Sequence, residues 1–510
     1  MAALNLTIAL LQIAWSSTND AANVATASAA IADAAAWTPP ADLAVFPQDY
    51  LLSDQHVDTI AALAAQHEIA IAVTYAATST VNHTSNLVLW DRTGTRVLAR
   101  SQALPFDPHT AFVPHVANLS LGDGGRRHAI VGAVLGAGSL WAPMHTRTLM
   151  LAGAEVVIAP VASPSLASDG PCIGYQSQSG CGLDDAMLLT RAWENAGAFI
   201  RVNHVTPARG NGFSAVAVNG PDGNIEHAAF VAGPFPVRNG GKGGAERASV
   251  DLEHLREIRA TTIWGDAFRH PWAYQKLCGF GTPPIPPPVP ASSETGGNVK
   301  LTVAALQLDE CYNATACLSA AEAAAREAAA KGADVAILPE MFSVGYSAQY
   351  PGYTRGEPHA KLKAAYDWAR LGQTPNGIYI TKLAALAKEL GMAIAASFMQ
   401  EDPATDGGGG AGPPRNSVAL LDKQGRLQYV YSKVHTCDWG ADEATTQPGR
   451  QFFTGLIELG GGADPLRVGS MICAARQRFA AENTFSHRAA LHLHSYGPDA
   501  HSCKSASAVP

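Results

Sequence analysis

Short aliphatic runs alternate along the chain with longer Ala-rich stretches that also carry polar residues. The first run, NLTIALLQ at residues 5–12, is far shorter than the roughly 20 apolar residues that cross a bilayer, so we predict a buried strand. Residues 318–338, LSAAEAAAREAAAKGADVAIL, predict a helix closed by Gly332 and then another buried strand. This alternation predicts an α/β layered fold.

The pattern occurs twice. NLTIALLQ recurs as KLTVAALQ at residues 300–307, and ADLAVFPQ at residues 41–48 recurs as ADVAILPE at residues 333–340. Two more pairs follow in the same order, LAAQHEIAIAV with LAKELGMAIAA and VGAVLG with VGSMIC, at residues 63–73, 386–396, 131–136 and 468–473. Four ordered matches predict a tandem duplication of one domain.

A segment rich in Pro, Ser and Gly separates the two copies. It covers residues 282–298, TPPIPPPVPASSETGGN, has nothing to bury, and is predicted to be an extended linker. A chain of 510 residues exceeds the size at which a single core stops growing. We therefore predict one domain at residues 1–281 and a second at residues 299–510.

Composition narrows the class of protein. Hydrophobic residues make up 47% and charged residues 15%, which is typical of a globular chain, and a net charge of -8 argues against a nucleic-acid partner. No apolar segment is long enough to suggest a membrane span. The eight cysteines are sparse and contain no C-x-x-C pair, so we expect a reducing, cytoplasmic compartment, with an organellar one left open.

Three polar residues of the second copy follow predicted strands. Glu340 lies in ILPEMFSVGY, Lys433 in YSKVHTCDWG, and Cys473 ends VGSMIC. Taken singly, each has an ordinary structural explanation: a helix cap, a solvated surface charge, and a small buried apolar residue.

Together and in this order, the three residues resemble the signature of the carbon-nitrogen hydrolase, or nitrilase, superfamily. The similarity is greatest to amidase-like members with KVHTCD after the lysine, and Glu443 matches the family's second, substrate-orienting glutamate. The resemblance implies a four-layer αββα sandwich, of which two units commonly pair through their helical layers. It implies no metal and no organic cofactor.

The implied reaction is hydrolysis of a small-molecule amide, carbamoyl compound or nitrile. Glu340 would take the proton of Cys473, Lys433 would stabilise the charge, and the attacking sulfur would form a thioester that water then cleaves. Phe342, Tyr346 and Trp439 are adjacent to these positions and either line the substrate site or serve ordinary packing.

The first copy carries Gln48, Gln102 and Gly136 at the matching positions. A glutamine cannot act as the carboxylate base and a glycine has no nucleophile, so this copy is expected to be inert and to serve as a built-in pairing partner.

The second copy departs from the family after Cys473, over residues 474–510. We expect it to lack the closing strands and helices that the first copy has. An alternative function follows, in which the protein is an inactive nitrilase-like binding or scaffolding protein.

Other reactive side chains carry no function in this interpretation. Several side chains near the end of the chain could be metal ligands, namely His487, His492, His494, His501 and Cys503. A loosely ordered tail is the simpler explanation of this segment, so no metal site is expected. Cys172 and Cys181, in a Ser/Gly-rich loop, are expected to be free thiols and could bridge if oxidised.

Overall fold

The chain forms two compact units, the first ending at Ala267 and the second beginning at Phe268. The computed structural model describes residues 4–77, 83–104, 113–121, 127–162, 183–205, 212–220, 228–236, 243–261, 301–309, 314–344, 372–401, 414–436, 446–458, 465–472 and 491–495. The predicted linker at residues 282–298 lies outside them, so the domain boundaries remain predictions.

The first unit contains two six-stranded sheets. One has the order β12-β1-β2-β3-β4-β5, with strands Gly243–Asp251, Asn5–Ile13, Leu43–Val45, Ala70–Ala77, His83–Trp90 and Arg96–Leu104. The other has the order β11-β10-β9-β8-β7-β6, with strands Ala228–Pro236, Gly212–Asn219, Ala198–Val202, Val156–Pro160, His128–Ala133 and Val116–Ser120. The predicted N-terminal strand is confirmed as β1.

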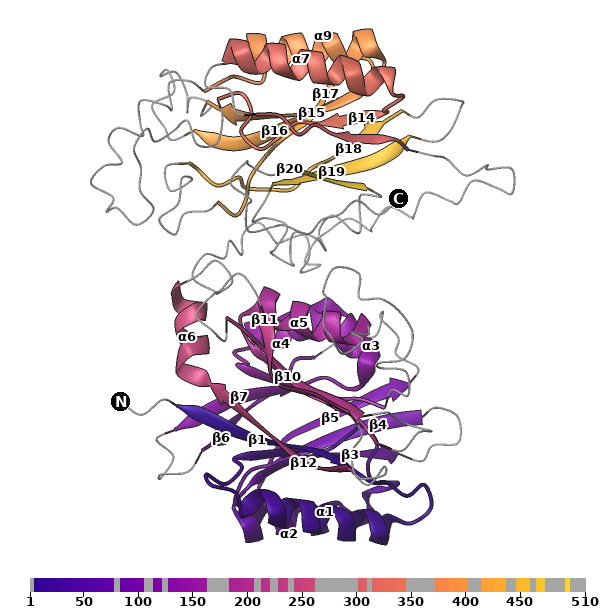
Figure 1. Ribbon diagram of the computed structural model, residues 1–510, viewed down its shortest axis with the longest axis vertical. Helices are drawn as coiled ribbons and strands as arrows, with labels where there is room; N and C mark the ends of the chain where they lie inside the picture. Colours follow the sequence, from indigo (N-terminus) through magenta and orange to yellow (C-terminus); the bar gives the residue numbers. More distant parts are fainter. Residues whose placement is uncertain are drawn as a thin grey trace, which may run out of the picture. The chain divides into compact units, whose positions relative to one another are not determined.

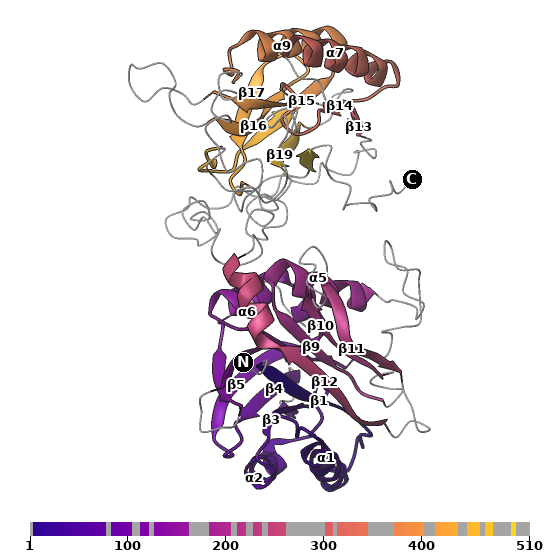
Figure 2. The same cartoon turned by 60° about the vertical axis from the view of Figure 1, so that its left-hand side comes forward.

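Helices cover the outer face of each sheet of the first unit, which gives four layers (Figure 1). The helices on these outer faces are α1 (Asp20–Ala35), the short 3-10 helix Asp54–His56, α2 (Val57–His67), α3 (Gly136–Trp141), α4 (Pro143–Leu151) and α5 (Leu183–Asn195). Helix α6 (Leu252–Thr261) instead packs Leu252 and Leu255 into the core between the sheets. Figure 2 shows α1 and α2 side by side beneath the sheet that contains β1.

The alternation along β1 explains the layering. Leu6, Ile8 and Leu10 point into the core between the two sheets, whereas Ala9 and Leu11 pack beneath α1 and α2. Successive side chains of a strand point to opposite faces, so a strand that is apolar at every position needs cover on both. The predicted αββα sandwich is therefore found in the first unit.

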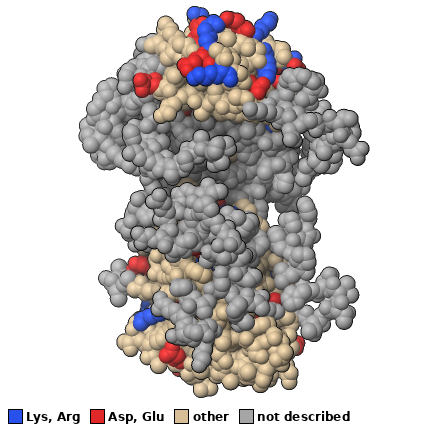
Figure 3. Space-filling view, turned by 45° about the vertical axis from the view of Figure 1, so that its right-hand side comes forward, with Lys and Arg blue, Asp and Glu red and all other residues tan. Residues whose placement is uncertain are grey.

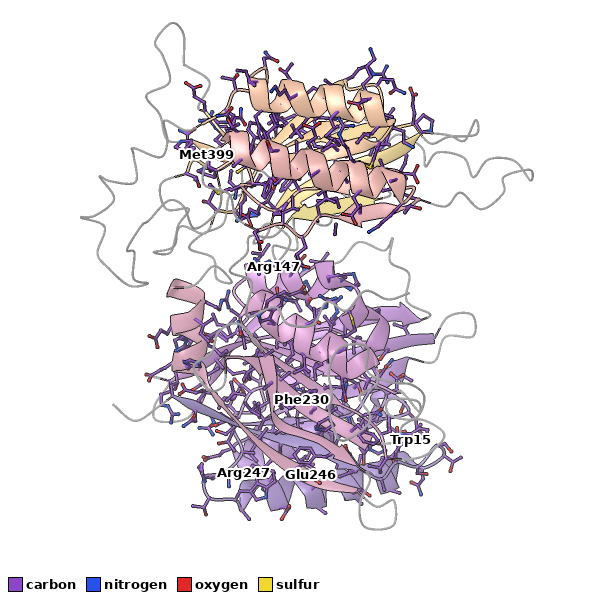
Figure 4. All side chains as sticks on the ribbon, turned by 45° about the horizontal axis from the view of Figure 1, so that its top comes forward. Trp15, Arg147, Phe230, Glu246, Arg247 and Met399 are labelled. Carbon is purple, nitrogen blue, oxygen red and sulfur yellow. The ribbon has the colours of Figure 1, made fainter. Side chains whose placement is uncertain are left out.

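Polar contacts fix the ends of these elements. The side chain of Asn19 accepts a hydrogen bond from the Ala22 N–H at 2.9 Å and so begins α1. After α1, Arg247 of β12, labelled in Figure 4, lies 5.9 Å from the Trp37 ring centroid and donates to the Thr38 carbonyl. These contacts attach the segment after the helix to the edge strand of the sheet.

The second unit has a five-stranded and a three-stranded sheet in its described residues. The first has the order β13-β14-β15-β16-β17, with strands Val303–Ala305, Val335–Ile337, Ala393–Gln400, Arg415–Leu421 and Leu427–Ser432. The second has the order β18-β19-β20, with strands Thr454–Ile457, Leu466–Ile472 and Leu491–Ser495. Helices α7 (Ala314–Ala330) and α9 (Ile378–Leu390) cover the five-stranded sheet. The predicted helix and strand at residues 318–338 are confirmed as α7 and β14.

The strand arrangements of the two units correspond. Strands β13 to β17 repeat the order and directions of β1 to β5, and β18-β19-β20 repeats the antiparallel and then parallel pairing of β6-β7-β8. Within the described part of the second unit, nothing corresponds to β9 through β12. This correspondence supports the duplication and the shortened second copy, and both remain predictions, as does pairing of the copies.

The described surface of the second unit mixes both signs of charge (Figure 3). On α7, Arg326 forms ion pairs with Glu322 and with Glu389 of α9, and Lys331 forms one with Glu327.

Among the described residues, no helix combines the length and apolarity that crossing a bilayer requires.

One cysteine differs from the expectation of reduced thiols. Cys317, buried in α7, is disulfide-bonded. Disulfides persist mainly in oxidising compartments, so this bond does not support the predicted cytoplasmic location, which remains a prediction. Cys172 and Cys181 lie outside the described residues.

Candidate active site

The turn after β14 fixes the position of Glu340. The Leu338 N–H donates to the Ala395 carbonyl at 3.1 Å, and the Ser397 hydroxyl donates to the carbonyls of Leu338 and Pro339. Met341 then adopts a left-handed backbone with φ 52°. The chain therefore turns sharply at the carboxyl end of the strand, and Glu340 is buried there with 1% of its surface exposed.

Lys433 is held at the carboxyl end of β17. Its N–H donates to the Asn416 carbonyl at 2.8 Å, and its own carbonyl accepts from the Gly449 N–H at 2.8 Å. A Cβ at position 449 would lie 2.0 Å from the Ser432 carbonyl oxygen, so only glycine allows this close approach. Gly449 thus helps to position the lysine.

The two charged side chains meet inside the unit. Lys433 Nζ lies 2.8 Å from Glu340 Oε1, and Asn416 Nδ2 donates to the same oxygen at 2.6 Å. Lys433 and Asn416 are fully buried. Because an isolated buried charge is very costly, this pairing allows both ionised groups to remain inside the protein. The structure therefore brings together Glu340 and Lys433, which are 93 positions apart in the chain.

Cys473 directly follows β19 and lies outside the described residues. The strand before it is anchored to β17, because the Tyr429 hydroxyl and the Ser470 hydroxyl are hydrogen-bonded at 2.7 Å. Met471 and Ile472 share a core with Tyr431 and its neighbours. Glu443, Tyr346 and Trp439 also lie outside the described residues, so their roles stay predictions.

Phe342 has a clear packing role. It is 2% exposed and packs among apolar residues of α7, α9 and the sheet, including Leu338, Tyr379 and Phe398. This environment is what the ordinary-packing alternative expects, and a contact with substrate remains an untested prediction.

Asn416 was missed by the sequence analysis. A signal for it was present, since RNSVALL opens with polar residues and continues as a buried strand, with Asn416 itself as the second residue of β16. Strand β16 pairs with β15 on one side and with β17 on the other. The amide of Asn416 can therefore reach residues at the ends of nearby strands of the sheet. Strand order, which the sequence does not give, makes it part of the site.

Among the described residues, no group of three His, Cys, Asp or Glu side chains could hold a metal ion. His492 and His494 lie on β20, while His487, His501 and Cys503 lie outside the described residues. The expectation of no metal site therefore stays a prediction.

The turn that holds Glu340 in the second unit also occurs in the first unit, but with a different side chain. Thr74 donates to the Pro47 carbonyl as Ser397 does to that of Pro339, and Asp49, after Gln48, has the same φ of 52° as Met341. Gln48 thus occupies the position of Glu340.

The strand register assigns the other two positions. Gln102 lies opposite Ser85 in β4, and Lys433 is bonded to the backbone of Asn416 in the corresponding strand β16. Gly136 follows β7 as Cys473 follows β19, and a Cβ placed on it would lie 3.3 Å from Gln48 Oε1.

Comparison with known proteins relates the second unit to one family. Residues 302–481 match the family model described as carbon-nitrogen hydrolase. These residues belong to the carbon-nitrogen hydrolase, or nitrilase, superfamily. The N-carbamoylputrescine amidase of Arabidopsis thaliana is 29% identical over 143 residues, which are 28% of this chain and 41% of that enzyme. The matched stretch therefore spans less than half of this relative.

Solved structures of carbon-nitrogen hydrolases also resemble the chain. The enzyme from Helicobacter pylori G27 has a TM-score of 0.38 at 18% identity, with 50% of this chain and 92% of that one covered. A mutant amidase from Nesterenkonia sp. AN1 in complex with butyramide has a TM-score of 0.36 at 21% identity, with 50% and 94% covered.

Proposed function

We propose that the carbon-nitrogen hydrolase unit cleaves a small amide or carbamoyl compound through a thioester on Cys473. The observation that carries the proposal is the fully buried pair of Glu340 and Lys433, joined at 2.8 Å. A buried ion pair is weak evidence for stability, because apolar residues of the same volume often do as well. Glu340 follows β14 and Lys433 follows β17, and both strands lie in the same sheet as β16. A catalytic role explains this position of the pair better than a contribution to stability.

In the first half-reaction, Glu340 accepts the proton of the Cys473 thiol and the sulfur attacks the amide carbon. The carbonyl π electrons move to oxygen, and the Lys433 ammonium stabilises the resulting charge. When the tetrahedral intermediate collapses, the C–N bond breaks and Glu340 returns its proton to the nitrogen. Ammonia or an amine leaves, and a Cys473 thioester remains.

In the second half-reaction, Glu340 takes a proton from water, and the hydroxide so formed attacks the thioester carbon. The C–S bond breaks, the carboxylic or carbamic acid is released, and the proton on Glu340 returns to the sulfur. Asn416 holds the carboxylate through both steps, since its amide donates to the oxygen that also faces Lys433. Glu443 is proposed to orient the substrate.

Amides and carbamoyl compounds are preferred over nitriles as substrates. The relative with 29% identity is named for a carbamoyl substrate, although it matches only 28% of this chain. Nitriles remain the alternative substrate class within the same proposal.

An inactive binding or scaffolding protein is the second candidate function. The observation that favours it is that the family match ends at residue 481, close after Cys473.

The experiment is mass spectrometry of the full chain after incubation with butyramide, N-carbamoylpropylamine and butyronitrile. We expect an acyl adduct on Cys473 and release of ammonia or amine, both lost in Cys473→Ala. Glu340→Gln should slow adduct formation at least about a hundredfold, because general base catalysis contributes factors of this size. Cys172→Ala is the matched control and should keep the adduct. No adduct and no ammonia from any compound would establish the inactive alternative.

A further inference from the structure

Three polar side chains from the neighbouring strands β15, β16 and β17 bond to one another in the second unit (Figure 1). Ser417 Oγ and Ser432 Oγ lie 2.9 Å apart, and Gln400 Oε1 accepts from Ser417 at 2.8 Å and from Ser432 at 3.2 Å. All three residues are buried. Two hydroxyls supply two protons for these three contacts, so two of the contacts are hydrogen bonds at any one time. We call Gln400, Ser417 and Ser432 the serine–glutamine trio.

The trio lies on the opposite face of the sheet from the buried ion pair. Along β16, Ala419 packs beneath α7 and α9, whereas Val418 packs toward β19. Because side chains alternate along a strand, Ser417 lies on the helix-facing side and its neighbour Asn416 on the other. A bond made by Ser417 therefore restrains the backbone that carries the Asn416 donor to Glu340.

The two serines form the last register pair of the β16–β17 ladder. Ser417 lies opposite Ser432, which is the final residue of β17 and directly precedes Lys433. Beyond this pair, the Lys433 N–H donates to the Asn416 carbonyl. The end of a ladder opens more readily than its interior, so both donors stand where the pairing is weakest. Gln400, the last residue of β15, adds a bond from a third strand.

The first unit has a simpler arrangement at the same register position. Asn86 and Ser101 form the corresponding pair, and the Ser101 hydroxyl donates to the Asn86 side chain. Ala77 ends β3 as Gln400 ends β15, and alanine supplies no side-chain acceptor. The third member of the trio thus occurs in the unit that contains the charged pair, and the unit with glutamines in place of those charges has an alanine there.

Stability alone does not explain three buried polar groups at these positions. Replacing both partners of a buried hydrogen bond by apolar groups of the same shape can be nearly neutral for the folded state. We propose that the residues of the trio are positioning residues, which hold the start of β16 against the end of β17. The Asn416 amide and the Lys433 ammonium thereby stay on the same oxygen of Glu340. The inference deepens the proposed function and rests on it for the effect on rate.

The test follows the ammonium protons of Lys433 by NMR in the full chain with isotopically labelled lysine. Their signal is identified by its loss in Lys433→Met, and buried, hydrogen-bonded protons exchange slowly with water. Gln400→Leu removes the shared acceptor, so we expect these protons to exchange about tenfold faster, as for loss of one hydrogen bond. Acylation of Cys473 by butyramide should slow by a similar factor.

Two substitutions of Ser432 separate the hydroxyl from the size of the side chain. Ser432→Ala should speed the exchange in the same direction as Gln400→Leu, whereas Ser432→Thr keeps the hydroxyl and should leave the exchange slow. Ser101→Ala is the matched control, because it removes the hydroxyl of the corresponding register pair in the first unit. It should change neither the exchange nor the acylation rate.

Backbone amide exchange separates positioning from a purely structural role. In Gln400→Leu, the amides in the interior of β16 should exchange as in the wild type while the Lys433 protons exchange faster. A parallel rise of both would overturn the inference, and so would unchanged Lys433 exchange in Gln400→Leu and Ser432→Ala. Absence of a Cys473 adduct in the wild type would instead contradict the proposed function, and the Lys433 protons would still decide the positioning role.

Discussion

Three buried polar residues, Glu340, Lys433 and Asn416, make up the described part of the proposed active site. Each comes from a different strand region, and the Lys433 ammonium and the Asn416 amide both donate to one oxygen of the Glu340 carboxylate. A charge-assisted hydrogen bond in a water-excluded site is stronger than a neutral one, so Asn416 holds Glu340 in one orientation as well as stabilising its charge.

Replacing Asn416 tests this positioning role. In Asn416→Leu the carboxylate loses a donor, and we expect the rate of Cys473 acylation to fall about tenfold to a hundredfold, as for loss of a hydrogen bond to a charged group. The acidic limb of the pH–rate profile should move to higher pH, because one bond that favours the ionised carboxylate is lost. Stopped-flow acylation by butyramide across a pH series measures both.

Gln424→Leu provides the control. Gln424 Nε2 also donates to a carboxylate, that of Glu458, at 2.9 Å, but this pair is exposed. Its loss should leave both the rate and the profile unchanged. An Asn416→Leu enzyme with a slower rate but an unmoved pH profile would show that the residue acts only through the stability of the fold.

At the scale of elements, helix α4 carries a buried titratable group, His145. His145 is 7% exposed, and burial together with the nearby Arg100 guanidinium lowers its pKa from 6.5 to about 4. The folded state therefore holds this ring neutral in a range of pH in which the unfolded chain protonates it.

This shift predicts a pH-dependent stability of the first unit. Because the folded pKa lies below the unfolded value, the stabilisation is fully present above pH 6.5 and is lost as the pH falls toward 4. The loss amounts to about 3 kcal/mol at most, from roughly 1.4 kcal/mol per pKa unit. Urea unfolding between pH 4 and 7 measures it, and His145→Phe should flatten the dependence. His128→Gln, at an exposed position of β7, should keep it. Equal slopes for the wild type and His145→Phe would contradict the assignment.

At the scale of the whole molecule, each apolar core belongs to one unit. Three clusters hold residues from the first unit alone, and two hold residues from the second unit alone. Cores that share no side chains can unfold independently of one another.

We therefore predict two separable unfolding transitions. The Gln12 amide donates to the Phe235 carbonyl of β11 and accepts from the Ser214 N–H of β10. Hydrogen exchange of the full chain in increasing urea, read peptide by peptide, should therefore show Gln12→Leu lowering protection in β1, β10 and β11. Asn416→Leu should lower it only in β14 through β17. A single transition, shifted for all peptides by either variant, would show that the two cores unfold as one.

The order of elements could be predicted from sequence because it rests on local patterns. A continuous short apolar run predicted β1, and the Ala-rich stretch before Gly332 predicted α7. Glu340 and Lys433 could be proposed as a pair because each follows an apolar strand and because, with Cys473, they match the signature of the family that the sequence resembles. Asn416 could not, because its importance depends on β16 lying between β15 and β17.

The sequence alone determined where strands and helices form, that their pattern occurs twice, and which residue types stand at strand ends, because these features depend on neighbours within a few positions. Tertiary structure decided which side chains meet. It buried an ammonium against a carboxylate 93 positions away, and it left two glutamines of the first unit facing α3 instead. Strand pairing brings distant positions together, because it buries whole faces of a sheet at once. The free energy gained by this burial depends on several strands together, so it cannot be read from any single segment.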